Sequence, residues 1–156
     1  MRAIFWVGLL TFLADQASKY YVVHILNLDR IKSLDVFPPF FNLRMAWNYG
    51  INFGLFSGES NNTRWILIAL ALIICAGVLW WVRREPGGIW QKIAAGLLVG
   101  GALGNVIDRL VYGAVADFLN MSCCGIDNPY AFNIADIAVF VGAVGMVVFS
   151  GEKKEA

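Results

Sequence analysis

The sequence predicts an all-α membrane protein in which four transmembrane helices carry a small β-rich cradle on their outer side. Hydrophobic residues make up 59% of the 156-residue chain and charged residues only 15%, whereas globular domains are about half apolar and about a quarter charged. The apolar residues are also gathered into four long runs. Spans of roughly 20 residues each use most of this length. We therefore expect residues 1–156 to form a single membrane-embedded domain.

The four apolar runs are each close to the length that crosses a hydrocarbon core as a helix. They lie at about residues 3–26, 65–82, 89–112 and 132–150. A helix satisfies its own backbone in lipid, which favours helices over isolated strands. The first run, which follows Arg2, could instead be a cleavable signal peptide. It lacks a clean small-x-small site and continues to Leu26, which favours a retained span.

Basic residues set the predicted orientation, because cytoplasmic loops carry an excess of Lys and Arg. With the N-terminus inside, the inner segments hold Arg2, Arg83, Arg84, Lys92, Lys153 and Lys154. The outer segments hold Arg30, Lys32, Arg44 and Arg64, all in or next to one long loop. Trp80, Trp81 and Trp90 flank the short inner loop, as interfacial aromatic residues do. We expect both termini in the cytoplasm.

The first outer loop, residues 27–63, is too long for a simple connection. Its middle part, VFPPFFNLRMAWNYGINFGLF, mixes aromatic and apolar residues with Pro and Gly. This pattern predicts short strands that lie on the membrane surface. The β-rich cradle is therefore assigned to this loop.

Cysteine, histidine and charge exclude several classes. The only histidine, His24, lies near a predicted helix end, so neither a Ser–His triad nor a multi-histidine metal site is expected. Cys75 lies in an apolar run and predicts a buried thiol. Cys123 and Cys124 are adjacent; we expect two free thiols, the alternative being a strained vicinal pair. A net charge of +1 argues against a nucleic-acid partner, and we expect no cofactor.

The ionisable residues of the spans mark a candidate site, because charges in a membrane are costly. Helical spacing puts several of them on shared faces. These residues are Asp15 with Lys19, Asn105 with Asp108 and Arg109, and Asn133 with Asp136, and Asp117 follows the third run. In the predicted orientation, Asp15 lies near mid-membrane and the others toward the outer side. A transporter needs polar groups along its whole path, so this distribution favours a site that works at the outer leaflet.

Asp117 and Asp136 come together if the third and fourth runs are neighbours. Two close carboxylates in a poorly hydrated place do not both ionise easily, so one keeps its proton. The charged carboxylate then accepts a proton from water and the protonated one donates to a carbonyl oxygen, which hydrolyses a peptide bond without serine, cysteine or metal. The alternative is that both aspartates are solvated or cap helices, where Asp136 would suit the helix dipole.

Small residues predict how the helices pack. Gly96, Gly100 and Gly104 recur every four residues and allow another helix to approach closely. The fourth run has a second small face. Its members are Ala135, Ala138, Gly142 and Gly145. Both stripes are interpreted as packing faces.

Four motifs, in order along the chain, together resemble one family. The motifs are DQASK at 15–19, FNLRMAWNYGINFGLF at 41–56, GGALGNVIDRLVYGAVADF at 100–118 and FNIAD at 132–136. They are similar to the DQxxK, FNLxxxxNxGxxFG, GGAxGNxxDRxxxGxVxDF and FNxAD elements of the lipoprotein signal peptidases, also called signal peptidase II. The chain departs from these patterns at Ala116 and Asn52, and the loop at 121–131 has fewer aromatic residues than expected.

This resemblance implies an aspartic endopeptidase of the bacterial inner membrane, with its site near the outer leaflet. Its substrate would be a prolipoprotein with diacylglycerol on its cysteine, cut just before that cysteine. Asp117 and Asp136 would be the catalytic pair. Asn105, Asp108, Arg109 and Asn133 would orient or polarise the site, and Asp15, Lys19, Asn48 and Gly50 would support it or contact substrate. Membrane lipid and globomycin-type peptide inhibitors would be further partners of a monomeric enzyme.

Two other function classes remain open on the sequence alone. A small transporter or proton channel would also place carboxylates in a membrane. A membrane scaffold would use the same helices without chemistry. Asparagine at position 117 or 136 separates the classes, since only a peptidase loses cleavage of a lipid-modified substrate.

Overall fold

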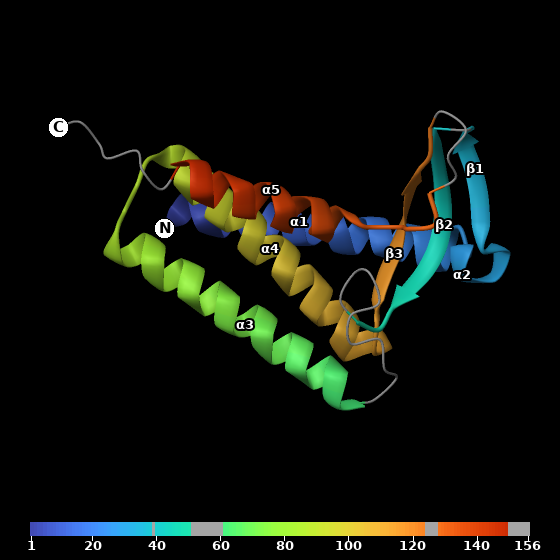
Figure 1. The fold of residues 1–156 in the computed structure, drawn as a ribbon, viewed down its shortest axis with the longest axis horizontal. Coiled ribbons are helices and arrows are strands. Elements are labelled where there is room, and N and C mark those ends of the chain that lie inside the picture. The colour runs from blue at the N-terminus through green and yellow to red at the C-terminus, as the bar shows by residue number, and fades with distance from the viewer. Residues whose placement is uncertain (39, 51–60, 124–127, 150–156) are drawn as a thin grey trace.

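The computed structural model describes residues 1–38, 40–50, 61–123 and 128–149 (Figure 1). Its long helices are α1 (Arg2–Tyr20), α3 (Asn61–Arg84), α4 (Ile89–Tyr112) and α5 (Ile134–Phe149). The π-helical turn η1 (Tyr21–Ile25) extends α1, and α2 (Leu28–Ile31) is a short helix beside the sheet. These long helices fall on the four predicted apolar runs, so the helical part of the fold prediction is confirmed. Within the described residues, α3 and α4 are long and apolar enough to cross a membrane, and α5 is a shorter apolar helix.

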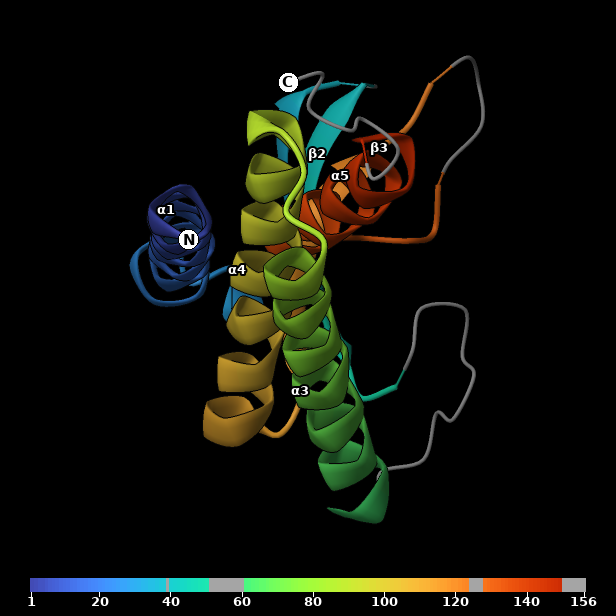
Figure 2. The ribbon, with the colours of Figure 1, turned by 90° about the vertical axis from the view of Figure 1, so that its left-hand side faces the viewer.

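Helix α4 is the centre of the bundle, because it packs against α1, α3 and α5 (Figure 2). Small residues make these contacts close. A methyl group on Gly100 would lie 2.4 Å from the carbonyl oxygen of Gly8 in α1. One on Gly142 in α5 would lie 2.6 Å from the amide nitrogen of Leu98. The predicted packing faces are therefore confirmed at these positions, and side chains such as Phe140, 70% exposed, point away from the bundle.

The sheet has three antiparallel strands in the order β1 (Ser33–Phe37), β2 (Phe41–Asn48) and β3 (Val115–Met121). The first two strands come from the outer loop, as predicted. The third comes from the segment after α4, so the expectation that the outer loop alone forms the cradle is wrong. Gly113, at φ +81°, ends α4 in the left-handed conformation that glycine tolerates, and the chain turns directly into β3.

The sheet is held against the end of the bundle by a small apolar core. Val22 of η1, Leu28 of α2, Leu43 of β2 and Phe118 of β3 are all buried and in contact. Figure 1 shows the strands crossing the end of the helices at a steep angle. Residues at the start of β3 consequently lie next to the N-terminus of α5.

The cysteines differ from their prediction in one respect. Cys75 is a buried free thiol, as expected. Cys123, at the far end of the sheet, is disulfide-bonded, so the expectation of a free thiol there is wrong. Cys124 and Asn52 lie outside the described residues. His24 is exposed, and its Nε2 is 3.0 Å from the hydroxyl of Tyr112, consistent with a helix-end position.

Candidate active site

Asp117 lies near the start of β3, and its carboxylate is almost completely buried, with the residue only 2% exposed. Asn133 donates to its Oδ1 over 2.6 Å, and Asn48 donates to its Oδ2 over 3.1 Å. Burial and, next, the negative charge of Asp136 raise the pKa of Asp117 from 3.8 to about 7. These two causes outweigh the hydrogen bonds, which act in the opposite direction. Asp117 therefore titrates near neutral pH.

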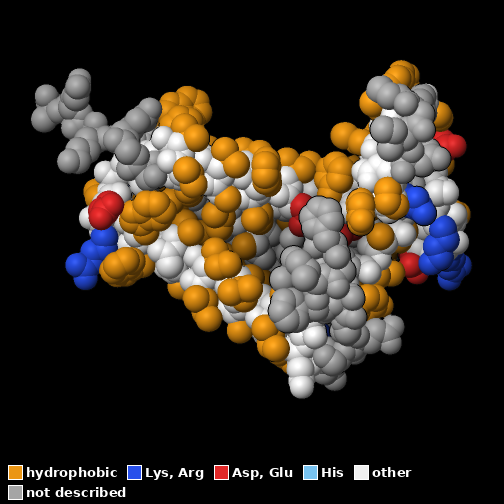
Figure 3. Space-filling view, in the orientation of Figure 1, with side chains coloured by type: hydrophobic (Ala, Val, Ile, Leu, Met, Phe, Trp, Pro, Cys, Tyr) orange, Lys and Arg blue, Asp and Glu red, His pale blue; other side chains and the backbone are white. Residues whose placement is uncertain are grey.

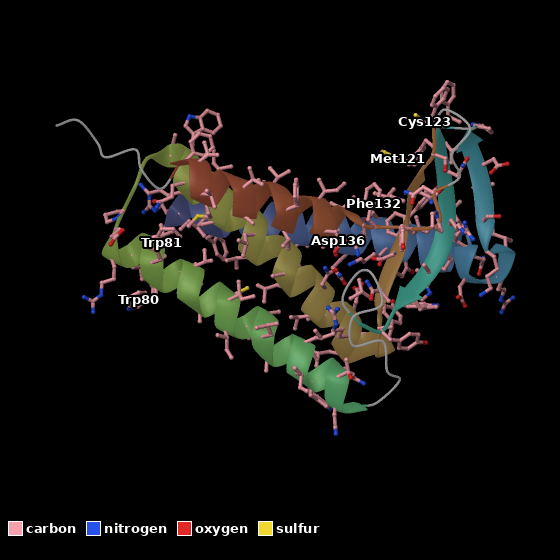
Figure 4. The ribbon with its side chains drawn as sticks, in the orientation of Figure 1. Trp80, Trp81, Met121, Cys123, Phe132 and Asp136 are labelled. Carbon is pink, nitrogen blue, oxygen red and sulfur yellow. The ribbon has the colours of Figure 1, made fainter. Side chains whose placement is uncertain are left out.

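Asp136 lies in the first turn of α5 and is placed there by a capping box. Asn133 precedes the helix, and its Oδ1 accepts from the backbone N–H of Asp136 over 2.8 Å. In return, the Asp136 Oδ2 accepts from the backbone N–H of Asn133 over 3.2 Å. Just before Asn133, Phe132 exchanges backbone hydrogen bonds with Leu119 of β3. Figure 4 shows Phe132 and Asp136 close together where the sheet meets the start of α5. The two predicted catalytic aspartates thus meet around a single residue, Asn133.

Three asparagines present their amino groups to this pair, and in each the amide oxygen is engaged by a donor. The Oδ1 of Asn48 accepts from Gly50 N–H, that of Asn133 from Asp136 N–H and that of Asn105 from Lys19 Nζ. Each amide is thereby oriented with its nitrogen toward a carboxylate. Asn105 donates to Asp136 Oδ1 over 2.9 Å. Both oxygens of each aspartate consequently accept a hydrogen bond from a neutral group.

Arg109 lies beside the pair on α4. It donates to the backbone oxygens of Asn105, at 3.3 Å, and Gly50, at 3.2 Å. Among the nearby carboxylates, Asp136 has the strongest charge interaction with the Arg109 guanidinium, and Asp117 has the next strongest. Arg109 does not pair with Asp108, its neighbour in sequence, because Asp108 pairs with Lys19.

A buried ionic cluster lies directly below the pair. Lys19 is 2.8 Å from both Asp15 and Asp108, and all three residues are at most 3% exposed. Asp15 also accepts from the backbone N–H of Ala135 at the start of α5, and Asp108 accepts from that of Ala116 in β3. The cluster therefore ties together α1, α4, α5 and β3 behind the two catalytic candidates.

Gln16 is a member of this cluster that the sequence analysis missed. Its Nε2 donates to Asp15 over 3.1 Å and to Asp108 over 3.0 Å. Its position beside Asp15, as a polar residue in an apolar run, was the available signal. Gly104 was assigned to packing, but it also makes room here, because a methyl group on it would lie 2.5 Å from Asp15 Oδ2.

This arrangement can activate water between two carboxylates of unequal environment. Within the described residues, no group of three or more His, Cys, Asp or Glu side chains could hold a metal ion. A mostly helical bundle with a small sheet, holding a close pair of aspartates of which one is buried, defines an aspartic peptidase as the class of enzyme.

Comparison with known proteins gives the family. A model of signal peptidase (SPase) II, the peptidase A8 family, matches residues 7–151, so the chain belongs to this family of lipoprotein signal peptidases. A lipoprotein signal peptidase of Alteromonas mediterranea is 39% identical over 155 residues, covering 96% of this chain and 82% of the relative. One from Methylorubrum extorquens is 41% identical over 145 residues, covering 92% and 83%.

The fold is also that of a solved bacterial membrane enzyme. That structure, determined by the in meso method at 2.3 Å resolution, superposes with a TM-score of 0.81 at 27% identity. The match covers 95% of this chain and 87% of the other. The chain is therefore a bacterial membrane enzyme with membrane-spanning helices.

Proposed function

We propose that this enzyme removes the signal peptide from diacylglyceryl-modified prolipoproteins by cutting just before the lipidated cysteine, with Asp117 and Asp136 as its catalytic residues. The observation that carries the proposal is the meeting of these two carboxylates, Asp117 buried and Asp136 half-buried, at Asn133, which donates to both of them. Membership of the signal peptidase II family supports the substrate class.

The different surroundings of the two carboxylates support different roles for them in this proposal. Asp117 is the group that holds the proton, because its pKa of about 7 leaves it about half protonated at neutral pH and mostly protonated below it. Asp136 is the charged partner, at a helix N-terminus and beside Arg109. Asp136 takes a proton from water, the resulting hydroxide attacks the peptide carbonyl, and Asp117 protonates the carbonyl oxygen. When the resulting gem-diol intermediate collapses, Asp136 gives its proton to the leaving amine and one hydroxyl of the intermediate returns its proton to Asp117.

The surrounding side chains keep this pair in place. Asn105, Asn133 and Asn48 hold the carboxylate oxygens by hydrogen bonds. Arg109 and the Gly50 carbonyl close one side of the site, where substrate would contact them. The ionic cluster of Asp15, Lys19 and Asp108 supports the site from below.

All four long helices cross the bacterial inner membrane in this proposal, with both termini in the cytoplasm. Arg83 and Arg84 end α3 on the inner side, and the aspartate pair lies at the opposite end of the bundle, near the outer leaflet. The exposed apolar side chains of α1, α3 and α5 face lipid. The enzyme acts as a monomer, and globomycin-type peptides inhibit it by occupying the substrate's place.

Cleavage assays with purified variants test the proposal. Wild-type enzyme should cut a lipid-modified prolipoprotein and not the same protein without lipid. Asp117→Asn and Asp136→Asn should both abolish cleavage and remain folded, whereas Glu85→Gln, the same chemical change in an exposed residue of the inner loop, should retain full activity. Full turnover by either aspartate variant would overturn the assignment.

A further inference from the structure

A groove of about 550 Å³ lies between α1 and α3, with α4 as its floor. Helices α1 and α3 both pack on α4 and make little contact with each other, and Figure 2 shows them apart on either side of it. The groove is lined by apolar side chains and glycine, and none of the residues of the aspartate site takes part. Its volume is in the range of about 300–1,000 Å³ that is typical of ligand sites. The bundle therefore has an apolar groove that the proposed chemistry does not use.

Each of the three helices carries a basic residue at the end of the groove that lies opposite the sheet. Every one of these cations shares a helix face with a residue that lines the groove, because positions three, four or seven apart in a helix lie on one side of it. The pairs of cation and lining residue are Arg2 with Phe5 on α1, Arg83 with Leu79 on α3, and Lys92 with Val99 on α4. Figure 3 shows hydrophobic side chains over the helices, and Lys and Arg side chains at the end opposite the sheet.

An excess of basic residues on the inner side is general in membrane proteins, so their number alone indicates no site. Their alignment with the groove is specific, and neighbouring Arg84 shows the contrast, since its guanidinium lies over the exposed ring of Trp80, 5.5 Å from its centroid. The acid that follows α3, Glu85, accepts from Trp81 Nε1 over 3.1 Å. Within the part of the chain that the structure describes, the three cations at the groove form no ion pair. Their charges are therefore available to an anion.

An apolar groove that ends at three cations matches an amphipathic anion. Basic pockets between membrane helices on the cytoplasmic side bind anionic lipid headgroups. Resting on the orientation proposed above, we propose that the groove binds one anionic phospholipid of the inner leaflet. An acyl chain lies along Val99 and Leu103, and the phosphate lies among Arg2, Arg83 and Lys92. The lipid fills the space between α1 and α3, so its binding stabilises the bundle.

Binding of two lipids with identical acyl chains tests the charge recognition. Phosphatidylglycerol or phosphatidylcholine is titrated into the purified full-length enzyme in a neutral detergent, and native mass spectrometry measures the fraction with one bound lipid. One cation beside an anionic lipid is worth roughly a five-fold change in affinity, so wild type should bind phosphatidylglycerol about 100-fold more tightly. The triple variant Arg2→Gln/Arg83→Gln/Lys92→Gln should bind both lipids alike. Arg84→Gln, the same change one residue along α3, should keep the preference.

A pair of matched substitutions on α4 tests the apolar part of the site. Val99→Phe fills the groove and should weaken the binding of both lipids at least about ten-fold. Val111→Phe, at a position that is 65% exposed and outside the groove, should leave both affinities unchanged. The Tm of each variant without added lipid checks its folding. Where Val99→Phe lowers that Tm, Leu9→Trp, which fills the groove from α1, must show the same loss of lipid binding.

Four results would overturn the proposal. Wild type that binds both lipids equally has no anion site, and a triple variant that keeps the preference has its anion site elsewhere. A loss in Arg84→Gln as large as that in Arg83→Gln would reduce the effect to general surface charge. Unchanged lipid binding by a folded Val99→Phe would exclude the groove. Peptide cleavage is not measured in these titrations, so each of these results leaves the proposed function standing.

Discussion

Replacing Asp117 with asparagine should make the stability of the protein depend less on pH. Its pKa in the folded protein is about 7, against 3.8 for the free side chain, and each ten-fold difference in proton affinity corresponds to about 1.36 kcal/mol. The contribution of Asp117 to the free energy of unfolding therefore falls by about 4 kcal/mol as pH rises from below 4 to above 7. The sign follows from the raised pKa: the stabilising protonated form is fully present below pH 3.8 and is lost as pH passes 7.

Thermal unfolding in detergent, followed by tryptophan fluorescence at pH 5 and pH 8, measures this effect. About 3 kcal/mol of the loss falls between these two pH values. Between pH 5 and pH 8, the Tm of wild type should therefore fall by several degrees more than the Tm of Asp117→Asn. In the asparagine variant, the new amide nitrogen faces a donor, either Asn48 or Asn133, and this destabilises the variant. Because this cost does not depend on pH, it cancels when the two pH values are compared.

Asp29→Asn is the matched control with the opposite sign. The hydrogen bond from Trp47 lowers the pKa of Asp29, so its stabilising effect is present at neutral pH and lost on acidification. This variant should be slightly less stable than wild type by the same amount at pH 5 and pH 8, and the difference should disappear only as pH falls below 3.8. Equal Tm differences for Asp117→Asn at pH 5 and pH 8 would refute the reasoning about the buried aspartate.

Three further substitutions, one of them with a matched control, test packing and support. Gly142→Ala should lower Tm, at a cost of roughly 1–3 kcal/mol for overpacking, whereas Gly77→Ala, in open space on α3, should be neutral or stabilising by up to about 1 kcal/mol. Lys19→Met should destabilise by roughly 3–5 kcal/mol in unfolding assays, because it leaves two buried carboxylates without their cation. Asn133→Ala should cost about 1 kcal/mol through the lost cap and lower kcat roughly 10²-fold, measured as substrate turnover, while KM changes little.

The sequence predicted the helices well because apolar runs of membrane length have few other structures available. It also predicted the pairing of Asp117 with Asp136, since polar residues at one depth of a bundle must meet one another. It did not predict that Asp117 lies on a strand. The segment after Gly113 is short and apolar, and its pairing with β2 depends on a partner about 70 residues earlier in the chain.

The roles within the polar cluster were equally hard to obtain from sequence. Helical spacing places Asn105, Asp108 and Arg109 on one face, but it does not say which acid each cation meets. The structure assigns Lys19 to Asp108 and leaves Arg109 with backbone oxygens. Gln16 escaped notice because a neutral amide in an apolar helix gives only a weak pattern.

The choice of partners around the aspartates bears directly on their chemistry. A cation in direct contact with both carboxylates would favour ionising both, and no proton would remain to donate. Here Lys19 is held by Asp15 and Asp108 and reaches the pair only through Asn105. Of the groups that act on the pKa of Asp117, Lys19 has the smallest effect, and burial and Asp136 have the largest. The asparagines therefore fix the carboxylate oxygens while leaving the pair able to retain the one proton that peptide hydrolysis requires.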